Sequence, residues 1–267
     1  TGLVITGGWL ALLFYGPFWF FWLTFLALGA LALNEYLNMT MANCSSRDKS
    51  IGIILGLLPL LAAYAGKAEA VSAGLFLALF LLIVYTPSRY GFLNQETSEF
   101  NPFPLILPLG FGIFHVCFSF AHFPLLLPLN AGQPLVSLFT VITVFSDSFA
   151  YYTGKMLGRH KLAPAISPGK TIEGLLGGLF GSVLGAIIVC LWFFPDYSLA
   201  KISILTVFLS MIGVLGDLTE SMIKRTMGVK DSGNILPGHG GVLDRLDSLM
   251  IAAPVLFYML HFGIINF

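Results

Sequence analysis

The residues best suited to chemistry lie near the C-terminal end of the sequence and begin with Asp217. Ser221, Lys224 and Arg225 follow it at i+4, i+7 and i+8, so on a helix the four side chains share one face. The carboxylate would lie at membrane depth and the two bases at the cytoplasmic surface. One helix face would therefore present an acid, a hydroxyl and two cations.

More acidic groups follow a glycine-rich turn, PGHGG at 237–241. Glycine lets the backbone turn sharply and approach a ligand closely. A helix is expected to begin near Leu243, which places Asp244, Asp247 and Ser248 on one face at i, i+3 and i+4. Two helices joined by this turn would aim three carboxylates at one point.

Asp217, Asp244 and Asp247 require a cation if they converge, because close carboxylates cannot all stay ionised in a low-dielectric site. Their oxygens suit Mg²⁺ at one or two metal sites, the second of which could take a different cation. The basic residues around the same point are Lys224, Arg225, Lys230 and Arg245. Such a site suits transfer of a phosphoryl-type group, where the protein positions the reactants and neutralises charge. The alternative is an interfacial helix whose basic residues only anchor it at the cytoplasmic surface.

Two groups upstream are expected to complete the site. Asp147 lies eight residues before Lys155, roughly 12 Å below the interface on a helix. An intramembrane carboxylate predicts a functional site, and the alternative for Asp147 is a structural ion pair with Lys170 or Arg159. Lys170 precedes a helix expected to begin at Thr171, where the N-terminal amides favour an anion.

The elements that position these residues are predicted to be transmembrane helices. The chain has 267 residues, of which 57% are hydrophobic and only 10% are charged, unlike an ordinary soluble domain. Backbone groups in lipid must be paired within each segment, so apolar runs of roughly 20 residues predict helices. The ten-residue alternation of a transmembrane β-barrel is absent from the sequence. We expect an all-α integral membrane protein with a polytopic helical bundle.

About nine membrane-spanning helices are expected from apolar runs separated by Gly, Pro or charge. Their ranges are 3–15, 18–37, 50–66, 70–86, 103–121, 133–154, 172–194, 201–218, which continues along the interface to 227, and 246–266. With the N-terminus in the cytoplasm, only Lys67 and Lys201 of the 13 Lys and Arg fall on the outer side, in keeping with the positive-inside rule. The first run is expected to be a retained span and not a cleaved signal.

Two regions are predicted along the chain. Residues 1–132 would form a transmembrane scaffold of about five helices. Residues 133–267 would form the catalytic region, with cytoplasmic loops at 155–171 and 224–245.

The scaffold region contains few polar groups. Asn34 and Glu35 are the exception, and they could line a cavity or simply extend to the interface. Residues 87–102 are expected to be a polar cytoplasmic loop, and residues 122–132 an outer loop or half-helix. Prolines and glycines in 103–121 predict a bent fifth span.

Charge and cysteine content exclude several classes of function. The net charge is zero, so no overall field would attract nucleic acid. Cys44, Cys117 and Cys190 are far apart and form no Cys-x-x-Cys pair, so they are expected to be free thiols and not zinc or redox ligands.

The C-terminal half resembles the phosphatidate cytidylyltransferases, also called CDP-diacylglycerol synthases. The run that carries the resemblance is Ser221, Lys224, Arg225, Lys230, Asp231, Pro237, His239, Gly240, Gly241, Asp244, Arg245 and Asp247. Further matching residues are Asp147, Ser167, Pro168, Lys170, Thr171, Glu173 and Gly174. The likeness is specific over residues 140–250 and rests on hydropathy alone upstream.

The resemblance implies transfer of CMP from CTP to the phosphate of phosphatidic acid, with release of pyrophosphate. The enzyme would be a Mg²⁺-dependent, multi-pass homodimer of a bacterial inner membrane. The lipid phosphate is already anionic and would itself attack, so no Ser, Cys or His nucleophile is needed. Because CTP is cytosolic, the active site would face the cytoplasm.

The resemblance also implies a role for each site residue. The catalytic residues would be Asp217, Lys224, Asp244 and Asp247, and the three aspartates would bind metal. The substrate-binding residues would be Asp147, Lys170, Ser221, Arg225, Lys230, Asp231, His239 and Arg245. Among these, Lys224, Arg225 and Lys230 would carry the β- and γ-phosphates of CTP, and Lys170 and Arg245 the phosphatidate head group. His239 would either contact the nucleotide or only shape its turn.

Two rival functions are weighed against this one. A CDP-alcohol phosphotransferase also uses intramembrane aspartates, but its Asp-Gly-x-x-Ala-Arg pattern is absent from the sequence. A secondary transporter of an anionic substrate would use Asp147 and Asp217 as coupling groups. Against the transporter, the polar residues gather at the inner ends of the spans and not at a midplane site.

Overall fold

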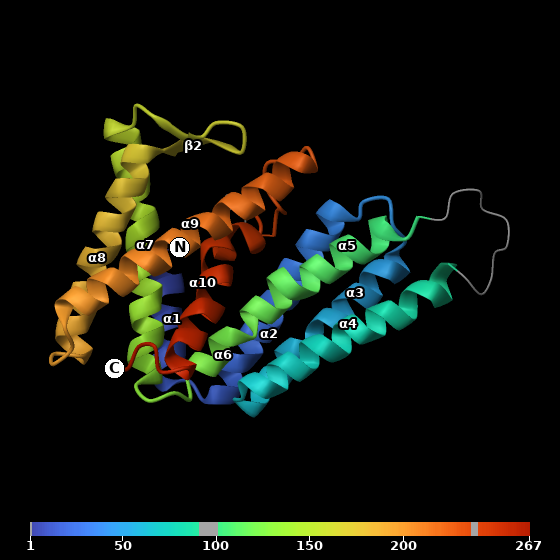
Figure 1. Ribbon diagram of the computed structural model, residues 1–267, viewed down its shortest axis with the longest axis horizontal. Helices are drawn as coiled ribbons and strands as arrows, with labels where there is room; N and C mark the ends of the chain where they lie inside the picture. Colours follow the sequence, from blue (N-terminus) through green and yellow to red (C-terminus); the bar gives the residue numbers. More distant parts are fainter. Residues whose placement is uncertain (1, 91–100, 236–239) are drawn as a thin grey trace. The chain divides into compact units, whose positions relative to one another are not determined.

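Helices account for most of the chain, as its low charge and long apolar runs predict. The computed structural model describes residues 2–90, 101–235 and 240–267 (Figure 1). It divides into two units. The first unit comprises Thr1–Leu125 and Asp231–Arg245, and the second comprises Leu126–Lys230 and Leu246–Phe267. The segment 231–245, which holds much of the predicted site, thus belongs with helices from the start of the chain.

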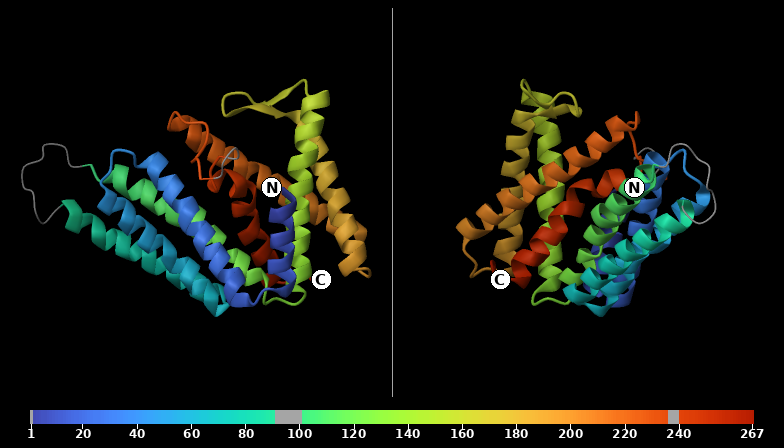
Figure 2. Two further views of the ribbon diagram at one scale, coloured as in Figure 1. Left: turned by 180° about the vertical axis from the view of Figure 1, so that it is seen from behind. Right: turned by 45° about the vertical axis from the view of Figure 1, so that its right-hand side comes forward.

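The first unit is a helical bundle whose helices end at breaks in the apolar sequence. Its elements are α1 (Gly2–Tyr15), α2 (Phe18–Thr40), α3 (Ser46–Ala62), a 3₁₀ turn (Ala63–Ala65), α4 (Ala68–Tyr90), α5 (Phe103–Gly112), a π-helical turn (Ile113–Phe118) and the start of α6 (His122–Leu126). Pro17 precedes α2, and the Ser45 hydroxyl caps α3 by accepting the Asp48 amide at 3.2 Å. The helices α2 to α5 run side by side (Figures 1 and 2).

The fifth expected span is an irregular helix, as its prolines and glycines predict. α5 contains Pro108, which removes one backbone donor. The chain then continues as the π-helical turn Ile113–Phe118, the kind of local irregularity that interrupts regular α-helices. The expected outer loop or half-helix at 122–132 contains the short helix α6.

The second unit contains the long helices that carry the second half of the predicted site. Its elements are α7 (Gly132–Leu157), β1 (Lys161–Ala163), β2 (Ser167–Thr171), α8 (Ile172–Phe193), α9 (Leu199–Thr226) and α10 (Leu243–His261) from Leu246 onward. α7 and α8 lie side by side with the β-strands at their shared end (Figure 2). A Cβ at Gly178 would lie 3.0 Å from the Ser146 carbonyl oxygen, so glycine allows the two helices to approach closely.

A two-stranded antiparallel hairpin replaces the plain loop expected before α8. Lys161 pairs with Thr171 and Ala163 pairs with Ser167. Glu173, in the first turn of α8, accepts the backbone amides of Arg159 at 3.0 Å and His160 at 3.2 Å. Glu173, whose negative charge suits the N-terminal end of the helix dipole, therefore also links the hairpin to α8.

Seven of the described helices are long and apolar enough to cross a membrane: Phe18–Thr40, Ser46–Ala65, Ala68–Arg89, Phe103–Leu126, Gly132–Leu157, Ile172–Phe193 and Leu199–Thr226. α1 has 14 residues, and α10 contains Pro254; neither is among the seven. Each of the nine expected ranges nevertheless overlaps a helix. Nine crossings and a cytoplasmic N-terminus stay predictions.

Two expectations fall partly outside the described residues. They are the polar loop at 87–102, of which 91–100 are not described, and the glycine-rich turn at 237–241, of which 237–239 are not described. His239 is within the latter range.

Candidate functional site

α9 carries a polar face along its last turns, at the positions that the sequence spacing predicts. The Ser221 hydroxyl donates to Asp217 Oδ1 at 3.3 Å. One turn on, Lys224 Nζ lies 2.9 Å from Glu220 Oε1, and both side chains are buried. The acidic residues Asp217 and Glu220 thus precede the basic Lys224 along the helix.

Lys170 joins this face from the hairpin. Its Nζ lies 2.5 Å from Asp217 Oδ2, and about a quarter of the lysine side chain is exposed. The position of Lys170 follows from its neighbours, because β2 runs directly into α8 and the Thr171 hydroxyl caps that helix by accepting the Gly174 amide at 3.0 Å. The end of β2 and the cap of α8 together determine the position of Lys170.

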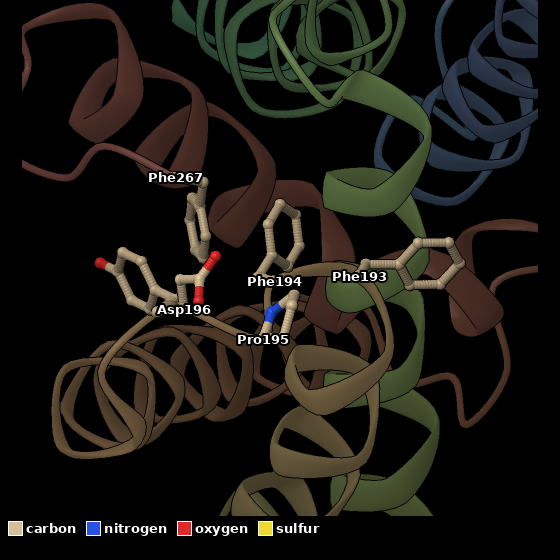
Figure 3. A pocket seen from close by; sticks show the side chains of 6 residues that line it. Phe193, Phe194, Pro195, Asp196 and Phe267 are labelled. Carbon is tan, nitrogen blue, oxygen red and sulfur yellow. The ribbon is translucent and has the colours of Figure 1, made fainter.

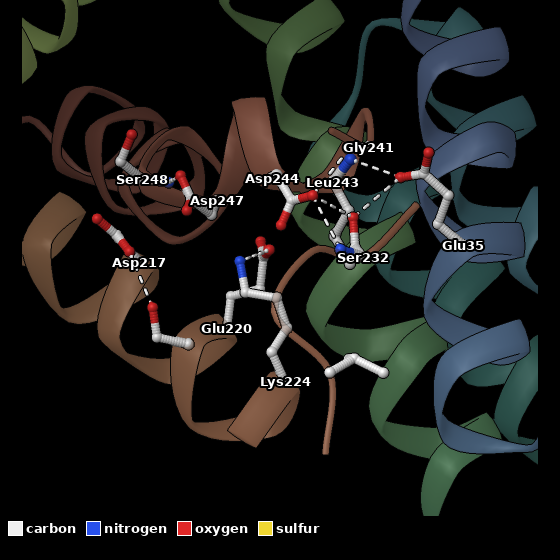
Figure 4. A network of polar contacts seen from close by, with 12 residues as sticks. Glu35, Asp217, Glu220, Lys224, Ser232, Gly241, Leu243, Asp244, Asp247 and Ser248 are labelled. Atoms are coloured by element: carbon white, nitrogen blue, oxygen red, sulfur yellow. Dashed lines mark hydrogen bonds and ion pairs between the residues drawn. The ribbon is translucent and has the colours of Figure 1, made fainter. Parts of the chain in front are cut away.

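α10 approaches the same face of α9 at two glycines. A Cβ at Gly216 would lie 2.6 Å from the backbone oxygen of Asp247, and one at Gly213 would lie 3.2 Å from the oxygen of Ser248. Asp217 and Asp247 therefore lie on facing parts of the two helices (Figure 4). Asp247 Oδ1 also accepts the Ser248 amide at 2.6 Å.

In the first unit, Asp244 accepts hydrogen bonds from both described parts of the segment 231–245, which are 231–235 and 240–245. Its Oδ2 accepts the Ser232 amide at 2.9 Å, the Ser232 hydroxyl at 3.0 Å and the Gly241 amide at 2.9 Å (Figure 4). Gly240 has a φ of +82°, which only glycine adopts without strain, and a Cβ there would lie 3.0 Å from Asp244 Oδ2. Gly240 and Gly241 therefore let the backbone before α10 lie close to this carboxylate.

Several predicted site residues are exposed: Asp147, Arg225, Lys230, Asp231 and Arg245. Arg225 donates to the carbonyl oxygens of Ile166 at 3.3 Å and Val229 at 3.0 Å, so it ties the hairpin turn to the end of α9. Asp147 is not among the α7 residues that the α8 glycines approach. Lys170 pairs with Asp217, and both the functional role and the structural ion pair expected for Asp147 stay predictions.

Sequence reasoning missed Glu220 and left the role of Glu35 open. Glu220 is the buried partner of Lys224, and the Glu-to-Lys spacing of four residues was the available signal. Glu35, on α2, accepts hydrogen bonds from Ser232, Val242 and Leu243. No local pattern relates it to residues about 200 positions away in the sequence.

The donor atoms of the second unit fit a magnesium ion chemically, because Asp217 and Asp247 offer carboxylate oxygens on facing helices. Within the part of the chain that the structure describes, no group of three or more His, Cys, Asp or Glu is arranged to hold a metal ion. The ammonium group of Lys170 neutralises the charge of Asp217, as a bound metal ion would. The three-aspartate metal site stays a prediction.

A pocket of about 300 Å³ occurs at the other end of α8. Its lining residues are Phe193, Phe194, Pro195, Asp196, Tyr197 and Phe267 (Figure 3). The length of α8 separates it from Lys170, and none of the predicted site residues lines it. The polar face of α9 is therefore the better candidate site.

Comparison of the sequence with known proteins identifies the family of this chain. The sequence matches the model of the cytidylyltransferase family over residues 1–263. A phosphatidate cytidylyltransferase of Staphylococcus aureus (strain COL) is 36% identical over 243 residues, which are 87% of this chain and 86% of that protein. Proteins of the same name from Staphylococcus epidermidis (strain ATCC 12228) and Staphylococcus saprophyticus are 34% and 35% identical, also over 87% of this chain and 86% of theirs. Because the match runs through both units and includes the acidic and basic residues of the site, the chain belongs to the cytidylyltransferase family.

Proposed function

We propose that the protein transfers CMP from CTP to phosphatidic acid and forms CDP-diacylglycerol and pyrophosphate. The relatives named above carry the name phosphatidate cytidylyltransferase. In the proposed reaction, a phosphate oxygen of the lipid attacks the α-phosphorus of CTP. The bond from that phosphorus to the bridging oxygen of the β-phosphate breaks, and pyrophosphate leaves with the electron pair.

The observation that carries the proposal is the ion pair between Lys170 and Asp217, with Asp247 on the facing helix. An anionic lipid must approach an anionic nucleotide, so the site must supply positive charge near the reacting atoms. A lysine held by one carboxylate can exchange that partner for a phosphate. The arrangement therefore supplies a cation already positioned beside the acidic residues.

The basic residues have distinct proposed tasks. Lys224 and Lys230 bind the β- and γ-phosphates and then the departing pyrophosphate, and Arg225 contributes while it fixes the hairpin turn. Lys170 and Arg245 bind the phosphate of phosphatidic acid. Each task is positioning and charge neutralisation, since the nucleophile belongs to the lipid.

Magnesium is proposed at one or two sites, bound by Asp217, Asp247 and Asp244, which lies three residues before Asp247 in α10. When bound, the ion would neutralise phosphate charge and orient the reactants. The chain's own contribution is to hold the carboxylates: Ser221 donates to Asp217, and Ser232 and Gly241 donate to Asp244.

The setting is proposed to be the inner membrane of a bacterium, with the site open to the cytoplasm and to the lipid leaflet. The seven apolar helices support a multi-pass protein. CTP would enter from the cytoplasm, whereas the acyl chains would stay in the bilayer. The active assembly is proposed to be a homodimer, which native mass spectrometry in detergent would test.

The proposal is tested with the purified full chain in detergent, phosphatidic acid, labelled CTP and Mg²⁺. We expect CDP-diacylglycerol and pyrophosphate in equal amounts, loss of both with a chelator, and recovery when Mg²⁺ is restored. Asp196→Asn, at the other end of the second unit, is the matched control and should leave the rate unchanged. Absence of product with folded protein and intact lipid would overturn the proposal.

A further inference from the structure

Glu35 is a buried carboxylate in the first unit, only 4% exposed and located on α2. A buried carboxylate is costly unless hydrogen bonds and positive potential compensate its desolvation. The residue lies in the region of the sequence that carries few other polar groups. The hydrogen-bond partners of Glu35 should therefore indicate the role of this buried carboxylate.

Both oxygens of Glu35 accept hydrogen bonds from the segment 231–245. Oε1 accepts the Val242 amide at 3.0 Å, and Oε2 accepts the Leu243 amide at 2.9 Å (Figure 4). Oε2 also accepts the Ser232 hydroxyl at 3.3 Å. Hydrogen bonds to an ionised carboxylate are stronger than those between neutral groups.

Two of these donors lie at the beginning of α10, which starts at Leu243. The first amides of a helix have no partner within the helix and attract negative charge. Serine, threonine, asparagine or aspartate at the preceding position usually satisfies them, but Val242 has no such side chain. Glu35 thus caps α10 from a helix about 200 residues earlier in the sequence.

The segment is built to receive this carboxylate. A Cβ at Gly233 would lie 2.7 Å from Glu35 Oε1, and one at Gly241 would lie 2.5 Å from Oε2. Any larger residue at either position would displace the glutamate or the backbone. Glu35 therefore explains the glycine at 233, and Glu35 together with the Ser232 hydroxyl explains the glycine at 241.

Ser232 connects Glu35 to the predicted site. Its hydroxyl lies 3.3 Å from Glu35 Oε2 and 3.0 Å from Asp244 Oδ2, and its amide also donates to Asp244. One hydroxyl hydrogen is thus shared between the two carboxylates. The Gly241 amide donates to Asp244, and the amide of the next residue, Val242, donates to Glu35.

We propose that Glu35 is a positioning residue: it holds Ser232 and residues 241–243 at the start of α10 and thereby fixes the orientation of the Asp244 carboxylate. Glu35 acts through Ser232 and the backbone and contacts no reacting atom. Its effect on turnover rests on the proposed function, but its effect on the segment does not. The two effects are therefore measured separately.

The first measurement is amide hydrogen exchange in the full chain, with no substrate. Glu35→Gln keeps the side-chain shape but replaces an acceptor oxygen by an NH₂ group facing backbone donors. We expect peptides that cover 240–245 to exchange at least about ten times faster, because amides freed from a hydrogen bond become open to exchange. Peptides from α3 and α4 should be unchanged. Glu69→Gln, an exposed residue of the same unit, is the matched control.

The second measurement is turnover. Glu35→Gln should lower kcat by about 10- to 100-fold, as loss of a partner that orients a metal-binding group does. The KM for CTP should change less than kcat, because Glu35 does not bind the nucleotide, and Glu35→Asp should recover part of the rate. Equal exchange over 240–245 in Glu35→Gln and the parent chain would overturn the proposal. An inactive parent chain would overturn the proposed function and leave the exchange result to decide on Glu35.

Ser232→Ala keeps the test decisive if Glu35→Gln does not fold. It removes the shared hydroxyl and leaves Glu35 with its two backbone donors. We expect about a ten-fold loss of kcat with exchange of the Val242 and Leu243 amides unchanged. Full activity of Ser232→Ala would show that Glu35 does not act on Asp244 through this residue.

Discussion

Lys170 and Asp217 form an ion pair with 2.5 Å between Nζ and Oδ2. The lysine comes from the end of β2 and the aspartate from α9, so the pair links the hairpin to the helix that carries most of the predicted site. Both side chains are partly exposed. Such pairs contribute little to stability, about 0–1 kcal/mol. The pair is therefore better explained by the charge it places at the site than by the energy it adds to the fold.

Replacement of this lysine should affect turnover far more than folding. Lys170→Ala is expected to lower kcat/KM for phosphatidic acid by about 100-fold, because a charged hydrogen bond to the lipid phosphate is lost. The apparent melting temperature should change little. Initial rates over a range of lipid concentrations, with CTP saturating, would measure the effect. Lys201→Ala, an exposed lysine near the start of α9, is the control. A Lys170 variant with the parent kcat/KM would remove this residue from the site.

The aspartates of α10 should be essential for turnover. Asp244→Ala and Asp247→Ala are each expected to abolish product formation, because the metal would lose a carboxylate oxygen. Circular dichroism and size-exclusion chromatography should show folded protein. If either variant kept more than about a tenth of the activity, which is a barrier change of only about 1.4 kcal/mol, that carboxylate would not be a metal ligand of the transition state.

The close contact between α9 and α10 offers a graded test. Gly216→Ala would place a methyl group 2.6 Å from the Asp247 oxygen, whereas Gly213→Ala would place one 3.2 Å from the Ser248 oxygen. Overpacking costs about 1–3 kcal/mol, so the first variant should push Asp247 away from Asp217 and lose at least about ten-fold in kcat. The second should keep most of its activity.

These two variants make the same change on the same face of α9, one turn apart. Thermal unfolding in detergent should rank their stabilities in the same order as their rates. Equal activity of both would mean that the α9–α10 contact does not set the position of Asp247.

Local sequence pattern predicts the helices well, because the length and interruption of apolar runs directly determine them. Gly16 and Pro17, for example, mark the break between α1 and α2, and Thr171 marks the start of α8. The hairpin was missed because its strands are short and basic and contain Pro168, with no alternation of apolar residues. A hydrogen bond to Glu173 stabilises the hairpin, and no local sequence pattern predicts that bond.

The candidate site, too, was predicted only in part. Spacing along one helix places Asp217, Ser221 and Lys224 on one face, and the structure has them there. The partners of Glu35 could not be predicted, because they are about 200 residues away and only the tertiary fold brings them to it. Helical periodicity therefore predicts which residues share one face of a single helix. It does not predict which residues far apart in the sequence contact each other.

Variants of the buried pair Glu220 and Lys224 allow its effects on stability and on turnover to be measured separately. Their side chains are 2% and 9% exposed, so loss of one partner leaves a desolvated charge. Glu220→Gln should therefore destabilise the protein by about 3–5 kcal/mol. Replacement of both charges by apolar residues, Glu220→Leu with Lys224→Met, should recover most of that loss, because no buried charge then remains.

The double variant should nevertheless be inactive, because Lys224 is proposed to bind the phosphates of CTP. Apparent melting temperatures of the single and double variants, measured beside their rates of pyrophosphate release, make the comparison. Lys201→Met is the control for the change of lysine to methionine. An active double variant would show that Lys224 serves only to neutralise Glu220. A Glu220→Gln variant as stable as the parent would show instead that the pair is not the source of stability that its burial implies.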